Sequence, residues 1–315
     1  MRVLVAGGGG FIGSHLVDRF LGRGDTVVAV DSFVTGRRQN LEHLSTEDRF
    51  ELVEHDITLG LPEMGRFDAV LNFASPASPD DFATMPIEIL EAGSVGNRRL
   101  LDLATACEAR FLLASTSEVY GDPQVHPQRE DYAGCVDPVG PRSCYDEAKR
   151  FAEAMTASYG HHRGADVAIA RIFNTYGERM SPFDGRVVNT FIVQALAGLS
   201  LTVHGDGTQT RSFCHVTDLV GGLVALLDSD CRGPVNIGEP TEVTVTEFAE
   251  MVIGVTGSSS SVTYMPLPDQ RGGDPQRRCP DIGMARSVLG WEPRVRLVDG
   301  LTATVEHFRG VESLG

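Results

Sequence analysis

Short apolar runs alternate with longer amphipathic segments through the first half of the chain. Six of these runs are typical of buried strands, at residues 3–6, 26–30, 50–53, 69–72, 110–114 and 167–171. Several of the intervening segments have the length and spacing of helices. Continuous apolar strands separated by helices indicate a parallel sheet that is covered on both faces. We therefore predict an α/β fold built on a Rossmann-like, doubly wound parallel sheet.

The pattern changes after about residue 172, where shorter pieces are interrupted by glycine and proline, as in residues 176–186 and 203–210. We predict a first domain over residues 1–171 and a smaller ligand-binding domain that takes most of residues 172–315. An apolar helical stretch at 218–227 indicates that the segment of about 211–237 returns to the first domain.

Charge and composition exclude several classes of partner. The formal net charge of -16 would repel a phosphate backbone or an anionic lipid surface, so we expect neither nucleic acid nor membrane as a partner. No apolar run approaches the ~18 residues that span a bilayer. The chain opens on a strand without a leader, which favours a cytoplasmic protein. The six cysteines lack the spacing of metal ligands, so we expect reduced thiols and no metal.

A glycine-rich turn joins the first strand to the first helix. Glycine at these positions lets the backbone approach a pyrophosphate, which the helix N-terminus then holds. The spacing is Gly-x-x-Gly-x-x-Gly, with glycines at Gly7, Gly10 and Gly13. The order strand, glycine turn and helix predicts a dinucleotide cofactor.

Asp31 ends the second strand, where a carboxylate can accept hydrogen bonds from an adenosine ribose and repel a 2′-phosphate. This position favours NAD over NADP. Arg37 and Arg38 count against that choice, because nearby arginines can bind the phosphate. Asp56, after the third strand, could hold the adenine or cap a helix.

Lys149 is the chain's only lysine, because its other basic residues are all arginines. It follows Tyr145 by four residues, which places both side chains on one face of a helix. A compact ammonium near the phenol should lower the tyrosine pKa from about 10 toward neutrality. The ordinary alternative is a solvated surface lysine.

Three polar residues, Thr116, Ser117 and Glu118, follow the fifth predicted strand. The carboxyl ends of strands in doubly wound sheets face the ligand crevice. We therefore expect these side chains to lie near Tyr145, where a hydroxyl can share the phenol proton and a carboxylate can orient a sugar or a water. Together with the glycine turn and Lys149, they predict a dehydrogenase site.

Longer stretches carry a resemblance to a known family. They are residues 31–37, 75–78, 111–123, 140–147, 170–177, 184–188 and 205–213, with 278–282 and 289–293 near the end. With these stretches, the chain resembles the extended short-chain dehydrogenase/reductase superfamily, and within it the UDP-glucuronate decarboxylases. The resemblance covers nearly the whole chain.

The resemblance implies tightly held NAD, a UDP-hexuronate substrate, a homodimer and decarboxylation through a 4-keto intermediate. It implies the catalytic residues Thr116, Glu118, Tyr145, Lys149 and Arg278. The implied cofactor residues are Gly7, Gly10, Phe11, Ile12, Gly13, Asp31, Ser32, Phe33, Thr35, Gly36, Asp56, Ile57, Tyr145 and Lys149. The implied substrate residues are Ser117, Asn174, Arg186, Val188, His204 and Arg211.

Several positions depart from the family pattern. Glu91 replaces a lysine expected to touch cofactor and substrate, and Arg98 or Arg99 could compensate. Ala92, Arg99, His204 and Glu178 also differ from the usual residues.

Two further functions stay open. A nucleotide-sugar C4-epimerase or 4,6-dehydratase would use the same intermediate, although a dehydratase usually has Asp-Glu where this chain has Ser117-Glu118. A non-catalytic nucleotide-binding relative is disfavoured by the intact set of Thr116, Tyr145 and Lys149.

Overall fold

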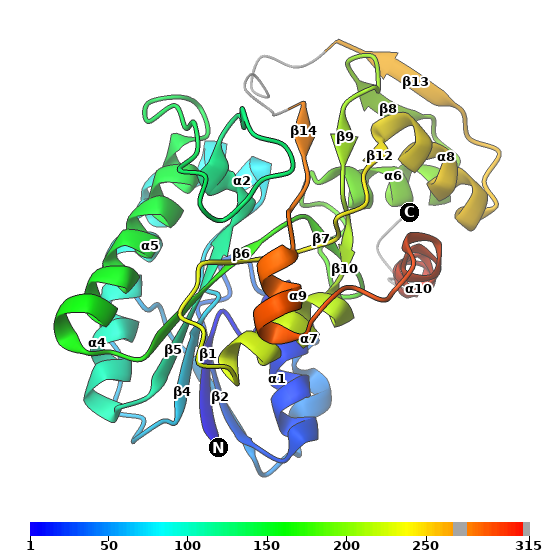
Figure 1. Cartoon of the computed structure of the whole chain (residues 1–315). Helices are drawn as coiled ribbons and strands as arrows, with labels where there is room; N and C mark the ends of the chain where they lie inside the picture. The colour runs from blue at the N-terminus through cyan, green and yellow to red at the C-terminus, as the bar shows by residue number, and fades with distance from the viewer. Residues whose placement is uncertain (267–275, 311–315) are drawn as a thin grey trace.

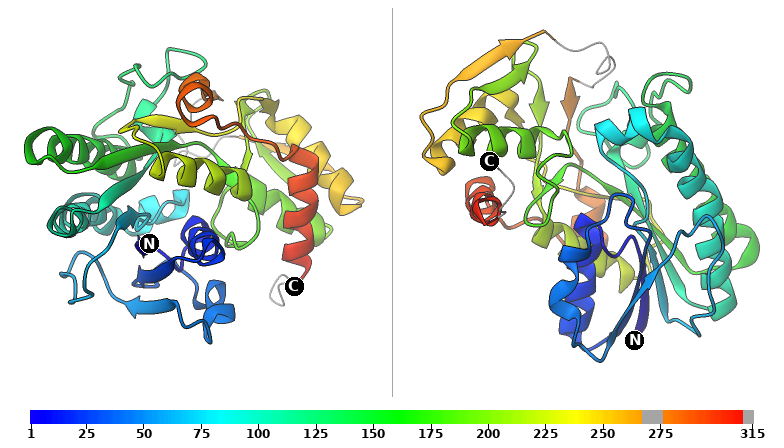
Figure 2. Two further views of the ribbon diagram at one scale, coloured as in Figure 1. Left: turned by 60° about the horizontal axis from the view of Figure 1, so that its bottom comes forward. Right: turned by 180° about the vertical axis from the view of Figure 1, so that it is seen from behind.

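The computed structural model describes residues 1–266 and 276–310. Parts of the predicted second domain, residues 267–275 and 311–315, lie outside the described residues. A seven-stranded sheet with helices on both faces carries a smaller lobe beyond the carboxyl ends of its strands (Figure 1). Two further views show the same arrangement from below and behind (Figure 2). No helix in the described parts of the chain is long and apolar enough to cross a membrane.

All seven strands of the main sheet run parallel, in the order β11-β6-β5-β4-β1-β2-β3. Their bounds are β1 (Arg2–Ala6), β2 (Thr26–Asp31), β3 (Phe50–Glu54), β4 (Ala69–Asn72), β5 (Arg110–Thr116), β6 (Val167–Ile172) and β11 (Val235–Ile237). The predicted fold class is confirmed, and the six predicted strands match within two residues. β11 pairs with β6, so part of the segment 211–237 joins this sheet. The domain boundary near residue 171 stays a prediction.

Apolar side chains on both faces of the strands explain why the sheet is buried. In β1, Val3 and Val5 join the core beneath α1 (Phe11–Arg23) and α7 (Val216–Leu227). Leu4 and Ala6 point the other way, into the core beneath α4 (Asn97–Cys107) and α5 (Ser143–Arg163). The helix predicted at 218–227 is confirmed as α7, which begins two residues earlier.

The smaller lobe has its own apolar core, which includes Phe191, Phe248 and Phe308. Its elements are α6 (Val187–Leu196), β8 (Leu201–His204), β9 (Thr210–Arg211), β12 (Val243–Thr244), α8 (Val245–Thr256), β13 (Val262–Met265), β14 (Arg277–Arg278) and α10 (Leu297–Arg309). β8 pairs with β13, and β9 lies between β12 and β14.

The remaining short elements of the described residues lie in the connections between these helices and strands. They are η1 (Arg38–Asn40), η2 (Glu42–Leu44), α2 (Pro79–Thr84), α3 (Pro86–Glu91), the π-helical η3 (Ala92–Gly96), η4 (Ser117–Tyr120), β7 (Thr175–Tyr176), β10 (Cys214–His215) and α9 (Gly283–Leu289). The chain runs from β1 outward to β2 and β3 and then crosses back to β4, on the other side of β1. This reversal opens a crevice at the carboxyl ends of β1 and β4, where such sheets bind ligands.

Candidate active site

A cavity of about 1120 Å³ lies at the carboxyl ends of the strands and is lined from both parts of the molecule. It brings together most of the residues predicted for the site. These are Gly7, Gly10, Phe11, Ile12, Gly13, Thr35, Thr116, Ser117, Glu118, Tyr145, Lys149, Asn174, Arg186, Val188, His204, Arg211 and Arg278. Six predicted cofactor residues lie outside the lining that the described residues form, namely Asp31, Ser32, Phe33, Gly36, Asp56 and Ile57. The role of each residue stays a prediction.

The turn after β1 can hold only glycine at two of its positions. Gly7 has a φ of +80°, and a Cβ there would lie 2.5 Å from the carbonyl oxygen of Phe73. A Cβ on Gly13 would overlap the carbonyl oxygen of Gly7, which lies across the turn. The first turn of α1 therefore packs directly on the end of β1, and its N-terminus faces the cavity through Gly10 and Phe11. This close approach suits a pyrophosphate.

Asp31, at the end of β2, fixes the loop beside that turn. Its carboxylate accepts hydrogen bonds from the backbone N–H groups of Gly9 and Phe33, both at 2.8 Å. Burial is the largest influence on this carboxyl and raises its pKa. A Cβ on Gly36 would lie 2.7 Å from Asp31 Oδ1, so the chain folds tightly over the carboxylate.

The side chain of Asp56 acts within its own turn. Its Oδ1 accepts hydrogen bonds from the backbone N–H and the hydroxyl of Thr58, both at 2.8 Å. No helix begins at Asp56, so the predicted helix cap is wrong, and the carboxylate instead closes a turn in the connection from β3 to β4. A contact with adenine stays a prediction. The neighbouring Ile57 is buried, and a Cβ on Gly96 would lie against it.

Arg37 and Arg38, the two arginines that favour NADP, lie in different surroundings. Arg38 forms an ion pair with Glu54 at the surface. Arg37 lines the cavity, where its Nη2 donates to Gln39 Oε1 at 2.7 Å.

Tyr145 and Lys149 lie together on α5, as their spacing predicts. Both side chains are buried and line the cavity. The ammonium donates to the carbonyl oxygen of Ala114 at 2.9 Å and lies 5.7 Å from the centre of the tyrosine ring. Thr116, at the end of β5, lies close enough to the Tyr145 hydroxyl to act on it and by itself lowers its pKa. The structure thus brings a phenol, a hydroxyl and an ammonium together in one cavity.

The predicted direction of the Tyr145 pKa is wrong for this structure. Burial and the nearby Glu118 carboxylate raise the pKa to about 12, because both disfavour the phenolate. Burial also lowers the pKa of Lys149 to about 8. The spacing of Tyr145 and Lys149 shows one charge, whereas desolvation and the carboxylate of Glu118 on η4 act through the tertiary structure.

Glu118 lies between two arginines that come from distant parts of the chain. Its Oε2 accepts from Arg278 Nη2 at 2.9 Å and forms an ion pair with Arg142 Nη2 at 2.8 Å, and Oε1 bonds Arg278 Nη1. Burial opposes its ionisation, but the two guanidinium groups outweigh burial and lower the pKa of Glu118 to about 2. The carboxylate is therefore ionised at neutral pH.

The predicted substrate residues line the part of the cavity nearer the small lobe. Arg186 donates from Nη2 to the carbonyl oxygen of Ala77 at 2.9 Å, and Arg211 donates to the carbonyl oxygen of Thr210 at 2.8 Å. His204 Nδ1 lies 3.3 Å from the carbonyl oxygen of Pro266.

Arg142 and Phe82 are among the cavity residues without a role predicted from the sequence. Arg142 precedes Tyr145 by three residues at the start of α5, and that helical spacing could have identified it. Phe82 comes from α2 and stacks on Tyr145, and no local pattern indicates this contact.

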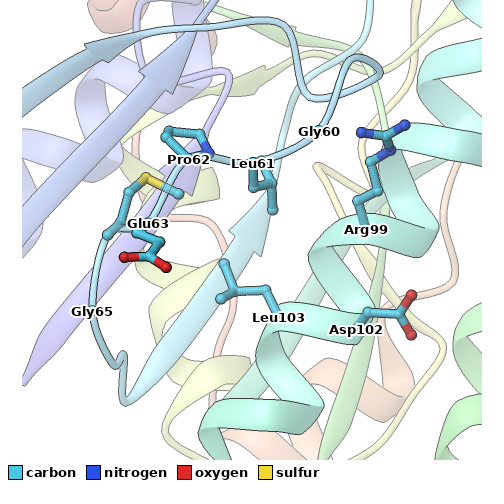
Figure 3. Close-up of a pocket in the computed structure, with 9 residues that line it drawn as sticks. Gly60, Leu61, Pro62, Glu63, Gly65, Arg99, Asp102 and Leu103 are labelled. Carbon is cyan, nitrogen blue, oxygen red and sulfur yellow. The ribbon is translucent and has the colours of Figure 1, made fainter.

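The departures from the family pattern lie away from this cavity, apart from His204. Glu91 is exposed at the end of α3. Arg98 lies 3.7 Å from Asp102 in an exposed ion pair. Arg99 lines a separate surface pocket of about 550 Å³ between α4 and the loop at residues 60–65 (Figure 3). The described structure therefore gives no compensating contact in the large cavity from either arginine.

Comparison with known sequences assigns the family. The family model described as GDP-mannose 4,6 dehydratase matches residues 4–304. UDP-glucuronic acid decarboxylase 1 of Danio rerio is 50% identical over 307 residues, which cover 98% of this chain and 72% of that protein. The chain belongs to the UDP-glucuronic acid decarboxylase family of the extended short-chain dehydrogenases. UDP-glucuronic acid decarboxylase 1 of Arabidopsis thaliana is 48% identical over 309 residues, with 98% and 70% coverage.

Solved structures share the fold over the full chain. A dTDP-glucose 4,6-dehydratase of Streptomyces venezuelae with NAD bound matches with a TM-score of 0.89 and 30% identity, covering 100% of both chains. The UDP-glucuronic acid 4-epimerase of Bacillus cereus, in complex with UDP-glucuronic acid and NAD, matches with a TM-score of 0.86 and 28% identity, covering 98% of this chain and 99% of its own.

Proposed function

We propose that this protein is an NAD-dependent carboxy-lyase that converts UDP-glucuronate to UDP-xylose. The main support is that the charged pair Glu118–Arg278 lies in the same cavity as Tyr145. Charged groups beside the predicted proton-transfer residue suit a substrate that has a carboxylate, such as a hexuronate. About 50% identity to UDP-glucuronic acid decarboxylases over nearly the whole chain supports the substrate.

The residues present fit NAD as the cofactor. The glycine turn lets a pyrophosphate approach the N-terminus of α1, and we assign the carboxylate of Asp31 to the adenosine ribose, where it would repel the 2′-phosphate of NADP. NAD⁺, when bound, accepts a hydride from the sugar and later returns it, so the reaction has no net redox change.

Tyr145 acts as a phenolate, so it first releases its own proton to water, because its pKa of about 12 keeps the phenol protonated at neutral pH. The phenolate then takes the proton of the C4 hydroxyl as C4 loses its hydride. We assign Thr116, whose side chain lies beside the phenol, to sharing that proton. The Lys149 ammonium, held on Ala114, favours the phenolate once it forms. The product of this step is a 4-ketone, which lies beta to the C6 carboxylate.

The C5–C6 bond then breaks. CO₂ leaves, and the bonding electrons move through C5 onto the C4 oxygen as an enolate. We assign Arg278 to the C6 carboxylate or the C5 proton. Glu118 is ionised at neutral pH, so it cannot itself supply the C5 proton. We assign it to orienting the ring or a water that delivers this proton. Return of the hydride to C4 and of the proton from Tyr145 gives UDP-xylose.

Arg186, Arg211 and Asn174 are assigned to the nucleotide diphosphate, since guanidinium groups bind phosphates by paired hydrogen bonds. Val188 and His204 lie on the same wall and are assigned to the nucleotide. C4 epimerisation is the second candidate, because the Bacillus cereus epimerase binds UDP-glucuronic acid and NAD in the same fold.

Incubation with UDP-glucuronate and catalytic NAD⁺, followed by mass spectrometry, tests the proposal. We expect a pentose nucleotide lighter by one CO₂ and no accumulated NADH. A hexuronate isomer of unchanged mass would assign an epimerase, and an unreacted substrate would refute both functions.

We also propose a homodimer formed through α3, η3 and α5. Exposed apolar side chains gather on these elements, namely Ile87, Leu90, Val95 and Phe151, and α3 packs beside α5. Large exposed apolar side chains that cluster on one surface are typical of an interface.

A cytoplasmic location is the remaining part of the proposal. All six cysteines lie within the described residues, and each is a free thiol. Unpaired cysteines fit a reducing compartment.

A further inference from the structure

The ring of Tyr145 is stacked on Phe82. The two ring centroids lie 4.8 Å apart, and the planes differ by 19°. Phe82 is buried, lines the cavity and comes from α2, a helix of six residues. The phenylalanine therefore covers a face of the tyrosine that performs the proposed proton transfer.

The stack is fixed by neighbours on α5. The thiol of Cys144 lies 3.7 Å from the carbonyl oxygen of Phe82, in a weak hydrogen bond. The guanidinium carbon of Arg142 lies 5.5 Å from the centre of the Phe82 ring. A small apolar cluster, formed by Phe82, Ile89, Cys144, Tyr145 and Ala148, encloses the two rings. Because its members come from α2, α3 and α5, the orientation of the tyrosine depends on where α2 lies.

The position of α2 is fixed at its first turn. Ser78 and Asp81 form a reciprocal capping box, in which each side chain accepts the other residue's backbone N–H, at 3.2 and 3.0 Å. The preceding residue, Ala77, accepts a hydrogen bond from Arg186 at 2.9 Å. Arg186 also lines the cavity. The start of α2, the helix that contains Phe82, is thus hydrogen-bonded to Arg186, which we assign to the nucleotide diphosphate.

We infer that Phe82 is a positioning residue for Tyr145: its stacked ring holds the phenol beside Thr116 and in line with the C4 hydroxyl. This inference rests on the proposed function. The tyrosine hydroxyl sits at the far end of a side chain that turns about two bonds, so a small rotation moves the oxygen by an appreciable distance. A displacement of about 1 Å at a reacting group can slow a reaction by about 100-fold. Packing against a flat ring restricts that rotation.

The test compares Phe82→Leu, which keeps an apolar side chain but removes the flat ring, with Phe82→Tyr, which keeps the ring. We expect Phe82→Leu to lower kcat by about 10- to 100-fold, with little change in KM for UDP-glucuronate or in NAD affinity. We expect Phe82→Tyr to recover most of that loss. With substrate deuterated at C4, the isotope effect on kcat should be larger in Phe82→Leu than in the wild type, because C4 oxidation then limits turnover.

A matched control separates positioning from stability. Phe308 is a fully buried phenylalanine in the core of the small lobe and does not line the cavity. Phe308→Leu should lower the melting temperature and leave kcat unchanged. If Phe82→Leu does not fold, Phe82→Met is measured with the same expectation.

Two results would overturn the inference while the wild type still forms UDP-xylose. One is an unchanged kcat in Phe82→Leu, and the other is a Phe82→Tyr variant as slow as Phe82→Leu. A wild type that forms no UDP-xylose would instead refute the proposed function.

Discussion

Replacing Glu118 by glutamine should destabilise the protein at neutral pH, because it removes the charge that pairs with the buried guanidinium of Arg278 and the partly buried one of Arg142. The pairing lowers the pKa of Glu118 from an ordinary 4.5 to about 2. That difference corresponds to about 3 kcal/mol of preference for the ionised form. The side chain is only 13% exposed, so water screens little of this energy. Glu118→Gln also leaves Arg278 buried with a weaker partner.

The pairing of Glu118 with the two arginines also makes the free energy of unfolding depend on pH. A carboxyl with a lowered pKa in the folded state stabilises the protein above its unfolded pKa, and this contribution is lost as the pH falls from about 4.5 to about 2. The free energy of unfolding should therefore be about 3 kcal/mol lower in Glu118→Gln than in the wild type at pH 7. The gap should shrink as the pH falls below 4.5.

Urea unfolding measures the free energy of unfolding of both proteins at each pH, and it can be followed by the fluorescence of Trp291, the chain's single tryptophan, which is buried. Asp299→Asn is the control, since Asp299 pairs with Arg296 at the surface at 2.7 Å and should leave the free energy of unfolding unchanged. Turnover should also fall in Glu118→Gln, with kcat and kcat/KM reduced together. Equal stability of Glu118→Gln and wild type at pH 7, or a gap that persists unchanged at pH 3, would refute this reasoning.

Three further substitutions test other parts of the site. Lys149→Arg should slow turnover by about 100-fold in a normally melting protein, because the guanidinium cannot replace an ammonium held on Ala114; near-normal turnover would contradict a catalytic role. Asp31→Ala should weaken NAD binding by about 10- to 100-fold in calorimetry, through loss of a charged hydrogen bond, and unchanged affinity would remove Asp31 from the cofactor site. Phe151→Glu should convert the dimer to monomer in light scattering, and an unchanged mass would move the interface elsewhere.

The main sheet could be predicted because its strands are buried on both faces and therefore appear as unbroken apolar runs. Val3 to Ala6 shows this directly, since all four residues are fully buried. β11 has only three residues, and its place beside β6 depends on α7 crossing the sheet. The small lobe could not be predicted in detail, because several of its strands have only two residues and depend on distant partners.

The candidate site was predicted where local spacing carries the chemistry. Tyr145 and Lys149 share a helical face, and the glycine turn joins a strand to a helix. The ion pairs around Glu118 join η4, β14 and the start of α5, so no local pattern reveals them. The pKa of Tyr145 was misjudged for the same reason, since burial and Glu118 act through the tertiary structure.

The fate of a deuterium label at C4 of UDP-glucuronate tests the central claim most directly. If one site oxidises C4, releases CO₂ and then reduces C4, the UDP-xylose product keeps the label at C4, because the hydride returns to the carbon it left. Mass spectrometry and proton NMR of the product should therefore show a pentose nucleotide that is deuterated at C4. A labelled hexuronate isomer without CO₂ release, or a pentose that has lost its label, would contradict the account.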